Sequence, residues 1–352
     1  GIMVFSDSNP EERIVDESLR EGEQTSEFSL RPALLNDFVG QNIIKENVQI
    51  GLEAAKLRET PLDHVMLYGP PGLGKTTLAH ILANEMGVNI KITSGPAIER
   101  AGDMAAMLTG LQDGDILFID EIHRLNKVVE EVLYSAMEDF FLSWVVGKGL
   151  AARNINLRIN PFCLIGATTR FSMVSAPLRD RFGSVYRLNY YDFDEMQQVL
   201  TRSADILDCA SNQEGIKQIA LRSRGTPRIG NRLLRRTRDY AIVRADGNIN
   251  EQVAKDALDM LQVDDRGLDQ SDHALLENLV EKFNGGPVGL DTLATSLSEE
   301  SDTVMDVLEP YLMQLGFLER TPRGRIATKA AYDYLGKTFP VKTDDQGRFE
   351  GL

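Results

Sequence analysis

The chain has 352 residues, of which 42% are hydrophobic and 26% are charged, and its formal net charge at pH 7 is −15. This composition is that of an ordinary globular protein, and the length allows two or three domains. No apolar run approaches the ~20 residues that a membrane-spanning helix needs. The acidic balance argues against indiscriminate nucleic-acid binding. Cys163 and Cys209 lack a CxxC partner, which argues against a zinc site or disulfide framework and favours a reducing cytoplasm.

The N-terminal segment, residues 1–30, carries eight acidic residues against two arginines and has little apolar content. Chains of this composition do not bury enough apolar surface to order themselves. The sequence therefore predicts a flexible acidic tail over residues 1–30.

A glycine-rich segment follows the apolar stretch at 64–68 and opens a helical pattern; it reads Gly69-Pro-Pro-Gly-Leu-Gly-Lys-Thr76. It matches G-x-x-x-x-G-K-[ST] in the strand–loop–helix context that gives this pattern its meaning. The backbone N–H groups of such a loop and the N-terminus of the following helix face the phosphates of a nucleotide. Lys75 would neutralise the β- and γ-phosphate oxygens, and the Thr76 hydroxyl would bind Mg²⁺.

A second acidic motif follows the buried-strand run Ile116-Leu-Phe-Ile119, which ends in Asp120-Glu121. Ligands collect at the carboxyl ends of parallel strands. We expect Asp120 to help organise Mg²⁺ and Glu121 to act as the base that polarises water. A glycine-rich turn and a helix-capping acid are the weaker alternative, since both halves of an ATP site occur in order. The chain is predicted to bind and hydrolyse ATP.

Residues 31–191 alternate short apolar strands with amphipathic helices, which is typical of an α/β domain with a parallel sheet covered on both faces. The predicted strands are 64–68, 89–93, 115–119, 162–167 and 184–188. Between the third and fourth, residues 141–159 form two β-prone arms around a glycine-containing turn, which indicates a hairpin. Its apolar residues either fold back on the sheet or form a protein-docking patch, and they are Trp144, Val145, Val146 and Leu150.

The remainder of the chain changes character twice. Residues 192–262 form a small helical domain, with helices predicted at 196–207, 213–222, 227–243 and 251–261. Residues 263–340 combine helices at 271–283, 288–297 and 301–315 with two short strands within 316–327. Three helices followed by a β-wing predict a winged helix.

Three further residues are candidates for the ATPase site. Thr169, at the tip of the strand beside Asp120, hydrogen-bonds the attacking water or γ-phosphate, or else the pair Thr168-Thr169 only caps the strand. Arg179 and Arg181 either reach the γ-phosphate bound by another subunit or form ion pairs within their own subunit.

The segment Gly225-Thr-Pro-Arg228 opens a helix with Thr226 as N-cap and Pro227 at the first helical position. Arg228 then lies in the first turn, where a cation opposes the helix dipole. This position requires an anionic partner, for which an ATP phosphate is the obvious candidate.

The predicted wing carries Arg320, Arg323 and Arg325, whose charges suit a DNA phosphate backbone and predict salt-sensitive binding. The preceding helix is acidic, which favours backbone contact without base readout. The alternative is a wing that only stabilises the fold or contacts protein.

These motifs, with Asp37-Phe-Val-Gly-Gln41, resemble the AAA+ ATPases, and among them the bacterial motors that drive branch migration of Holliday junctions. The similarity spans about residues 30–335. It implies a large AAA+ domain over 31–191, a lid over 192–262, a winged-helix DNA-binding head over 263–340 and a tail over 341–352. It also implies hexameric rings on duplex DNA that act with RuvA and the RuvC resolvase in recombination, DNA repair and the SOS response.

Residue by residue, the resemblance implies an adenine pocket near Leu30, Arg31 and Tyr191. The nucleotide loop would comprise Gly72, Gly74, Lys75, Thr76 and Thr77. Thr169 matches the first sensor, where many AAA+ members have Asn; Arg228 matches the second sensor and Arg181 the trans arginine finger. Glu138, Asp139 and Phe140 match a segment near a neighbour's nucleotide, and the hairpin at 141–160 matches the one that docks on RuvA.

Two other function classes compete. A clamp-loading or protein-remodelling ATPase would leave the wing arginines without a task. An ATP-switched transcription factor would need a helix suited to base reading. ATPase activity with and without duplex DNA separates the three classes.

Overall fold

The computed structural model describes residues 13–17, 20 and 23–341, apart from the side chain of Trp144. The chain divides into two compact units, residues 1–267 and 268–352. None of the helices in the described ranges is both long and apolar enough to cross a membrane. Apart from Val341, the predicted tail at 341–352 lies outside the described residues.

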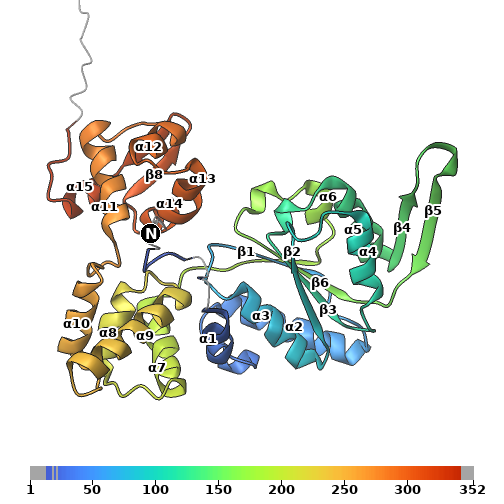
Figure 1. Cartoon of the computed structure of the whole chain (residues 1–352), viewed down its shortest axis with the longest axis horizontal. Coiled ribbons are helices and arrows are strands. Elements are labelled where there is room, and N and C mark those ends of the chain that lie inside the picture. Colours follow the sequence, from blue (N-terminus) through green and yellow to red (C-terminus); the bar gives the residue numbers. More distant parts are fainter. Residues whose placement is uncertain (1–12, 18–19, 21–22, 342–352) are drawn as a thin grey trace, which may run out of the picture. The chain divides into compact units, whose positions relative to one another are not determined.

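The centre of the first unit is a five-stranded parallel sheet with strand order β2-β3-β6-β1-β7 (Figure 1). Its strands are β1 (Val65–Tyr68), β2 (Ile90–Ser94), β3 (Ile116–Asp120), β6 (Cys163–Thr168) and β7 (Ser184–Arg187). All five predicted strands are confirmed. Because the strands are parallel, β1, β3 and β6 end at one edge of the sheet, where the phosphate loop and Asp120 begin.

The sheet is buried on both faces, because successive residues of its strands point into different apolar clusters. In β1, Val65 and Leu67 pack with one pair of helices and Met66 packs with the other pair. The first pair is α2 (Asn42–Arg58) and α3 (Lys75–Met86); the second is α4 (Ala101–Thr109) and α5 (Lys127–Asp139). Short helical turns complete the connections: η1 (Leu35–Asp37), η2 (Ile122–Arg124), η4 (Phe171–Met173) and α6 (Ala176–Arg179).

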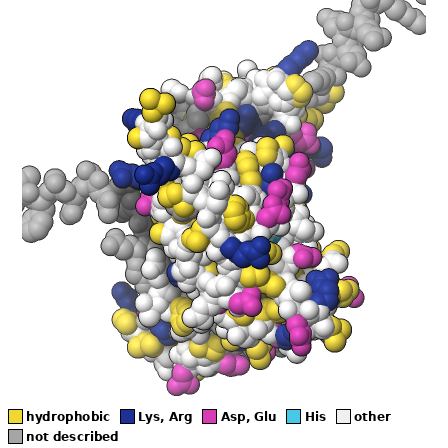
Figure 2. All heavy atoms as spheres, turned by 90° about the vertical axis from the view of Figure 1, so that its right-hand side faces the viewer, with side chains coloured by type: hydrophobic (Ala, Val, Ile, Leu, Met, Phe, Trp, Pro, Cys, Tyr) yellow, Lys and Arg dark blue, Asp and Glu magenta, His cyan; other side chains and the backbone are white. Residues whose placement is uncertain are grey.

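The predicted hairpin is confirmed as a separate antiparallel pair, β4 (Phe141–Val146) and β5 (Arg153–Arg158), joined through η3 (Gly149–Ala151). It stands away from the sheet (Figure 1), and Val145 and Leu150 are exposed. The alternative in which the hairpin folds back on the sheet is therefore wrong. On the side of the molecule that Figure 2 shows, hydrophobic side chains lie among acidic and basic ones.

The four helices predicted within residues 192–262 are confirmed as α7 (Phe193–Ile206), α8 (Gln213–Arg222), α9 (Pro227–Arg244) and α10 (Glu251–Met260). Their buried residues belong to the same apolar cluster as α2 and α3. Pro227 occupies the first position of α9, as predicted. Thr226 precedes it, but its hydroxyl donates to the Arg224 carbonyl oxygen at 3.3 Å. Thr226 therefore occupies the predicted N-cap position, but its side chain makes no capping hydrogen bond to α9.

The N-terminal segment contains a helix, α1 (Glu23–Leu30), and Val15 and Leu30 are buried. The prediction of a flexible tail is wrong for these residues; residues 1–12, 18–19 and 21–22 lie outside the described ranges. The physical reason is charge pairing, since Glu23 and Glu27 bind arginines of α9. The segment's own composition carries no sign of those distant partners.

The second unit has the predicted order of three helical segments and a β-hairpin. Its elements are α11 (Gln270–Glu277) with η5 (Asn278–Lys282), α12 (Leu290–Ser296), α13 (Ser301–Thr303) with η6 (Val304–Leu308), α14 (Glu309–Gln314), β8 (Leu318–Thr321), β9 (Gly324–Ala327) and α15 (Lys329–Tyr334). Helix α15 was not predicted; Thr328 caps it by accepting from the backbone N–H of Ala331.

Candidate active site

The phosphate loop joins β1 to α3 and bends through glycines in the left-handed region. Gly72 has φ +81° and Gly74 has φ +110°. A Cβ on Gly72 would lie 2.8 Å from Thr226 Cγ2 and 3.1 Å from Arg228 Cβ, so the loop packs closely against the start of the lid helix α9. Only glycine combines this backbone conformation with this approach.

Lys75 begins α3 and is buried, and its Nζ donates to the carbonyl oxygens of Gly69 (2.7 Å) and Pro70 (2.8 Å). Burial lowers the pKa of Lys75 from 10.5 to about 8, although the charge of Asp120 acts in the opposite direction. A buried ammonium at a helix N-terminus is a site that an anionic ligand stabilises. The loop therefore fits the phosphates of a nucleotide.

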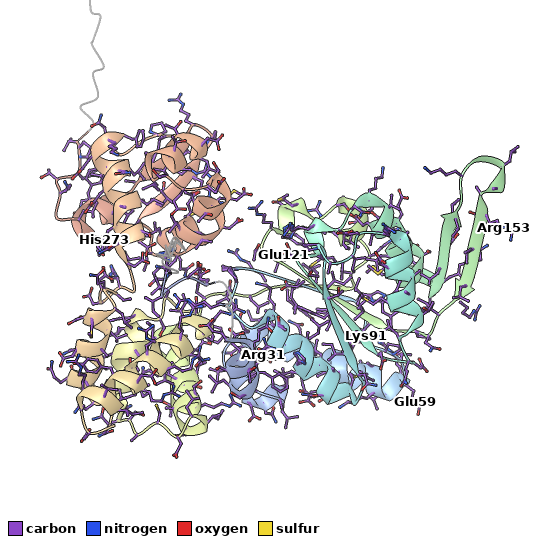
Figure 3. The ribbon with its side chains drawn as sticks, viewed as in Figure 1. Arg31, Glu59, Lys91, Glu121, Arg153 and His273 are labelled. Carbon is purple, nitrogen blue, oxygen red and sulfur yellow. The ribbon has the colours of Figure 1, made fainter. Side chains whose placement is uncertain are left out.

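Two carboxylates lie at the end of β3, and a backbone N–H group holds that of Asp120. The Glu121 N–H donates to Asp120 Oδ1 at 2.8 Å. Glu121 itself has φ +47°, a left-handed conformation that few non-glycine residues adopt. Its carboxylate is half-exposed and 3.2 Å from Arg124 Nη1. Figure 3 labels Glu121 at the tip of its strand, which leaves its carboxylate accessible to water.

The two threonines at the end of β6, Thr168 and Thr169, have different surroundings. Thr168 is buried; its hydroxyl lies 2.7 Å from His123 Nδ1 and accepts from the Arg170 N–H. Thr168 therefore has the capping role, whereas Thr169 lines the same cavity as Asp120 and Glu121. The bond between Thr168 and His123 ties neighbouring strand ends together, and no sequence motif indicated it.

A cavity of about 730 Å³ brings most of the predicted residues together. The predicted residues that line it are Leu30, Arg31, Gly72, Gly74, Lys75, Thr76, Thr77, Asp120, Glu121, Thr169, Tyr191 and Arg228. Tyr191 donates its hydroxyl to the Leu73 carbonyl oxygen at 3.3 Å, and burial raises its pKa above the ordinary value. The volume is that of a pocket for a cofactor-sized molecule.

Several lining residues were missed by sequence reasoning, among them Phe28, Phe38, His80, Val199, Arg202 and Asn231. Phe38 lies within a motif that was singled out, but nothing in the sequence indicated which way its ring points. The rings of Phe28 and His80 meet edge-on with centroids 6.2 Å apart. Burial lowers the pKa of His80, and the charge of Arg31 lowers it further, so this wall of the cavity favours the neutral imidazole.

The arginine-finger candidates lie elsewhere. Arg181 Nε is 3.1 Å from Glu138 Oε1, and its guanidinium stacks over the Tyr134 ring at 4.1 Å. Within its own subunit, Arg181 is therefore an ion-pair partner of Glu138. Arg179 lies over the Phe171 ring at 5.5 Å. Neither arginine lines the cavity.

The segment Glu138-Asp-Phe140 also lies outside the cavity. Phe140 ends α5 in a left-handed conformation, and its ring is 5.9 Å from that of Phe162 in the core. Within its own chain this segment supports the fold, while Glu138 holds Arg181.

In the second unit, Glu309 is fully buried and accepts from Arg325 Nε at 3.1 Å and from Arg320 Nε at 3.3 Å. The alternative in which wing arginines stabilise the fold therefore applies to Arg325, and in part to the more exposed Arg320. Arg323 is exposed, and no ion pair is found for it among the described residues.

Three family models match consecutive parts of the chain. A Holliday junction DNA helicase RuvB P-loop domain matches residues 30–188, a RuvB AAA lid domain 191–264, and a RuvB C-terminal winged helix domain 265–336. These matches agree with the sheet, the lid helices and the second unit.

Similar proteins cover almost the whole chain. The Holliday junction branch migration complex subunit RuvB of Dehalococcoides mccartyi is 57% identical over 98% of both chains. That of Chloroflexus aurantiacus is 57% identical over 94% of this chain and 95% of its own. The structure of the Thermotoga maritima RuvB Holliday junction branch migration motor is 50% identical to this chain with a TM-score of 0.80, and the match covers 89% of this chain and 100% of that one. With its phosphate loop, lid arginine and winged helix in that order, the chain belongs to the RuvB family of AAA+ ATPases.

Proposed function

We propose that this chain is an ATP-driven motor that moves the branch point of Holliday junctions during recombination and DNA repair. The observation that carries the proposal is the single cavity that joins the phosphate loop, the β3 carboxylates and the lid arginine, in a chain whose relatives are named as branch-migration subunits. Closure of a lid on a nucleotide is a movement that ATP hydrolysis can drive.

Within the cavity, each residue has a task that its position supports. Lys75 and the loop N–H groups bind phosphate oxygens, and Glu121 orients the attacking water. The aromatic and aliphatic wall near Leu30 and Tyr191 takes the adenine.

Mg²⁺ would be held by the Thr76 hydroxyl and Asp120, and it would neutralise charge on the phosphates. Both residues line the cavity. The described residues contain no group of three or more His, Cys, Asp or Glu side chains arranged for a metal ion. Two oxygen ligands fit Mg²⁺, which commonly completes its coordination with phosphate oxygens and water.

The proposal includes a hexameric ring in which Arg181 serves the nucleotide of the neighbouring subunit. To do so, Arg181 must exchange Glu138 for a phosphate, and a half-exposed carboxylate is a partner that it can leave. We expect Arg181→Ala rings to be inactive alone but partly active when mixed with Lys75→Ala subunits. ATPase activity of mixed rings, with mixing verified by native mass measurement, checks this. Mixed rings with no activity would contradict the trans role.

For DNA, we propose that Arg323 and the exposed edge of Arg320 contact the phosphate backbone without reading bases. For partners, the exposed apolar residues of the hairpin provide a surface for RuvA, with RuvC joining in the resolving complex. A cytoplasmic location and a place in the SOS response stay predictions.

The direct test is a four-way junction with one labelled arm, incubated with RuvA, ATP and the chain. Release of the labelled duplex with ATP but not with ADP supports the motor. A matching ATPase assay compares junction, linear duplex and no DNA at low and moderate salt. The ATPase rate of a motor should rise with DNA of any sequence. An ATPase rate that is the same with and without DNA would contradict the proposal.

A further inference from the structure

Two acidic residues of α1 join the N-terminal segment to the lid helix α9. Glu23 makes a two-pronged ion pair with Arg232, with Oε1 2.7 Å from Nε and Oε2 3.0 Å from Nη2. Burial alone would raise the pKa of Glu23, but hydrogen bonds from Arg232 and from the Arg20 backbone N–H lower it to about 2. One turn further on, Glu27 accepts from Arg228 Nε and from Arg31 Nη2, the latter at 3.4 Å.

The two pairs differ in what they face. Glu27 and Arg228 both line the nucleotide cavity, whereas Glu23 and Arg232 do not. The Arg232 side chain is only 3% exposed. The ion pair between Glu23 and Arg232 therefore anchors α1 to the lid helix α9. The ion pair between Glu27 and Arg228 lies where a bound phosphate would contact it.

The guanidinium of Arg228 is already shared. Its Nε donates to Glu27 and its Nη1 donates to the Glu17 carbonyl oxygen at 2.8 Å, while its Nη2 has no hydrogen-bond partner among the described residues. Carboxylates and phosphates bind guanidinium groups through the same planar donors, so they compete for them. Glu27 can give up Arg228 without becoming an isolated charge, because Arg31 remains beside it.

We propose that Glu27 is a positioning residue for Arg228, which passes from the Glu27 carboxylate to the terminal phosphate of ATP. ADP lacks that phosphate, so with ADP bound Arg228 stays paired with Glu27. Helix α1 then keeps both of its ion pairs with α9, the one made by Glu27 and the one made by Glu23. The acidic N-terminal helix thereby senses which nucleotide is bound. This inference rests on the proposed function, in which Arg228 is the lid arginine that reaches the nucleotide.

The test measures the affinities of the full chain for ADP and for the β,γ-imido analogue of ATP, each with Mg²⁺, and compares their ratio among variants. Glu27→Gln keeps the shape of the side chain but removes the charge that competes for Arg228. We expect the ratio to shift about tenfold towards the triphosphate, which corresponds to about 1.4 kcal/mol. Glu23→Gln is the matched control, and we expect its ratio to equal that of the wild type.

Glu27 could also lower the affinity for the triphosphate directly, by repelling its phosphates. A double variant distinguishes this repulsion from an effect that requires Arg228. In Arg228→Gln, replacing Glu27 by Gln should no longer change the ratio, because the arginine that was exchanged is gone. Glu27→Asp, which keeps the charge, should return the ratio towards that of the wild type. A shift that persists undiminished without Arg228 would overturn the exchange.

Hydrogen exchange of the wild-type chain tests the same idea without altering Glu27. Backbone amides of residues 23–30 should exchange faster with the triphosphate analogue than with ADP, because the ion pair between Glu27 and Arg228 is broken. Equal exchange with both nucleotides would contradict the proposal. A wild-type chain that bound neither nucleotide would sink the proposed function as well. An unchanged ratio in a chain that binds both would sink only the role of Glu27.

Discussion

The lid helix and the wing both carry arginines that bind a buried carboxylate, yet the two pairs lead to opposite conclusions. Arg228 and Glu27 line a cavity, so an incoming phosphate can compete for the arginine. Glu309 is fully buried, so losing Arg325 would leave a buried charge with only the partly exposed Arg320 as a partner. An arginine is available to a ligand only where losing its carboxylate costs little.

The largest effect is expected at the catalytic side of the cavity. Glu121→Gln keeps the size and the strained backbone position of the side chain but removes its basicity. We expect ATP turnover to fall by about 100- to 10,000-fold, with nucleotide affinity changed little. Single-turnover hydrolysis and binding titrations measure the two quantities separately. Wild-type turnover in this variant would remove Glu121 as the base.

The next effect tests the buried side of the comparison. Arg325→Ala leaves Glu309 with only the partly exposed Arg320, and we expect the second unit to lose about 3 kcal/mol of unfolding free energy. Arg323→Ala is the matched control, expected to stay within about 0.5 kcal/mol of the wild type. Urea unfolding of the full chain, followed by a probe in the second unit, gives both values. Equal stability of the two variants would show that Glu309 does not need Arg325.

Sequence reasoning located residues correctly where a short motif carries the whole signal, and the predicted loop residues, Asp120 and Glu121 do line one cavity. In the phosphate loop, at Asp120-Glu121 and at Pro227, the residue types and their immediate neighbours are enough to predict both the chemistry and the backbone conformation. Sequence reasoning failed where a charge is paired across a long stretch of chain. Glu23 and Glu27 made residues 1–30 resemble a tail because their partners, Arg232 and Arg228, lie some two hundred residues away. Likewise, nothing in the wing sequence separated Arg325, which binds Glu309, from Arg323, which does not.

A smaller effect concerns Lys75 and pH. Its pKa in the free chain is about 8, and a bound phosphate raises that pKa by stabilising the ammonium. Below pH 8 the Lys75 amine is already protonated, so the affinity for ADP with Mg²⁺ should not depend on pH there. Above pH 8 the amine has to take up a proton when the phosphate binds. The affinity should then fall as pH rises, by up to about tenfold per unit. Calorimetric titrations from pH 7 to 9.5 measure this. In Lys75→Arg the guanidinium stays charged, and the pH dependence should vanish even where affinity is weaker.

The smallest effect tests the exposed side of the wing. Because Arg323 makes no ion pair among the described residues and is exposed, its removal should not disturb the fold but should remove one phosphate contact. We expect Arg323→Ala to weaken duplex binding equally for unrelated sequences and to lower the salt dependence of log K by about one. Binding titrations at several salt concentrations give this slope. An unchanged slope would assign DNA contact to another part of the chain, and a sequence-dependent loss would show that the wing reads bases.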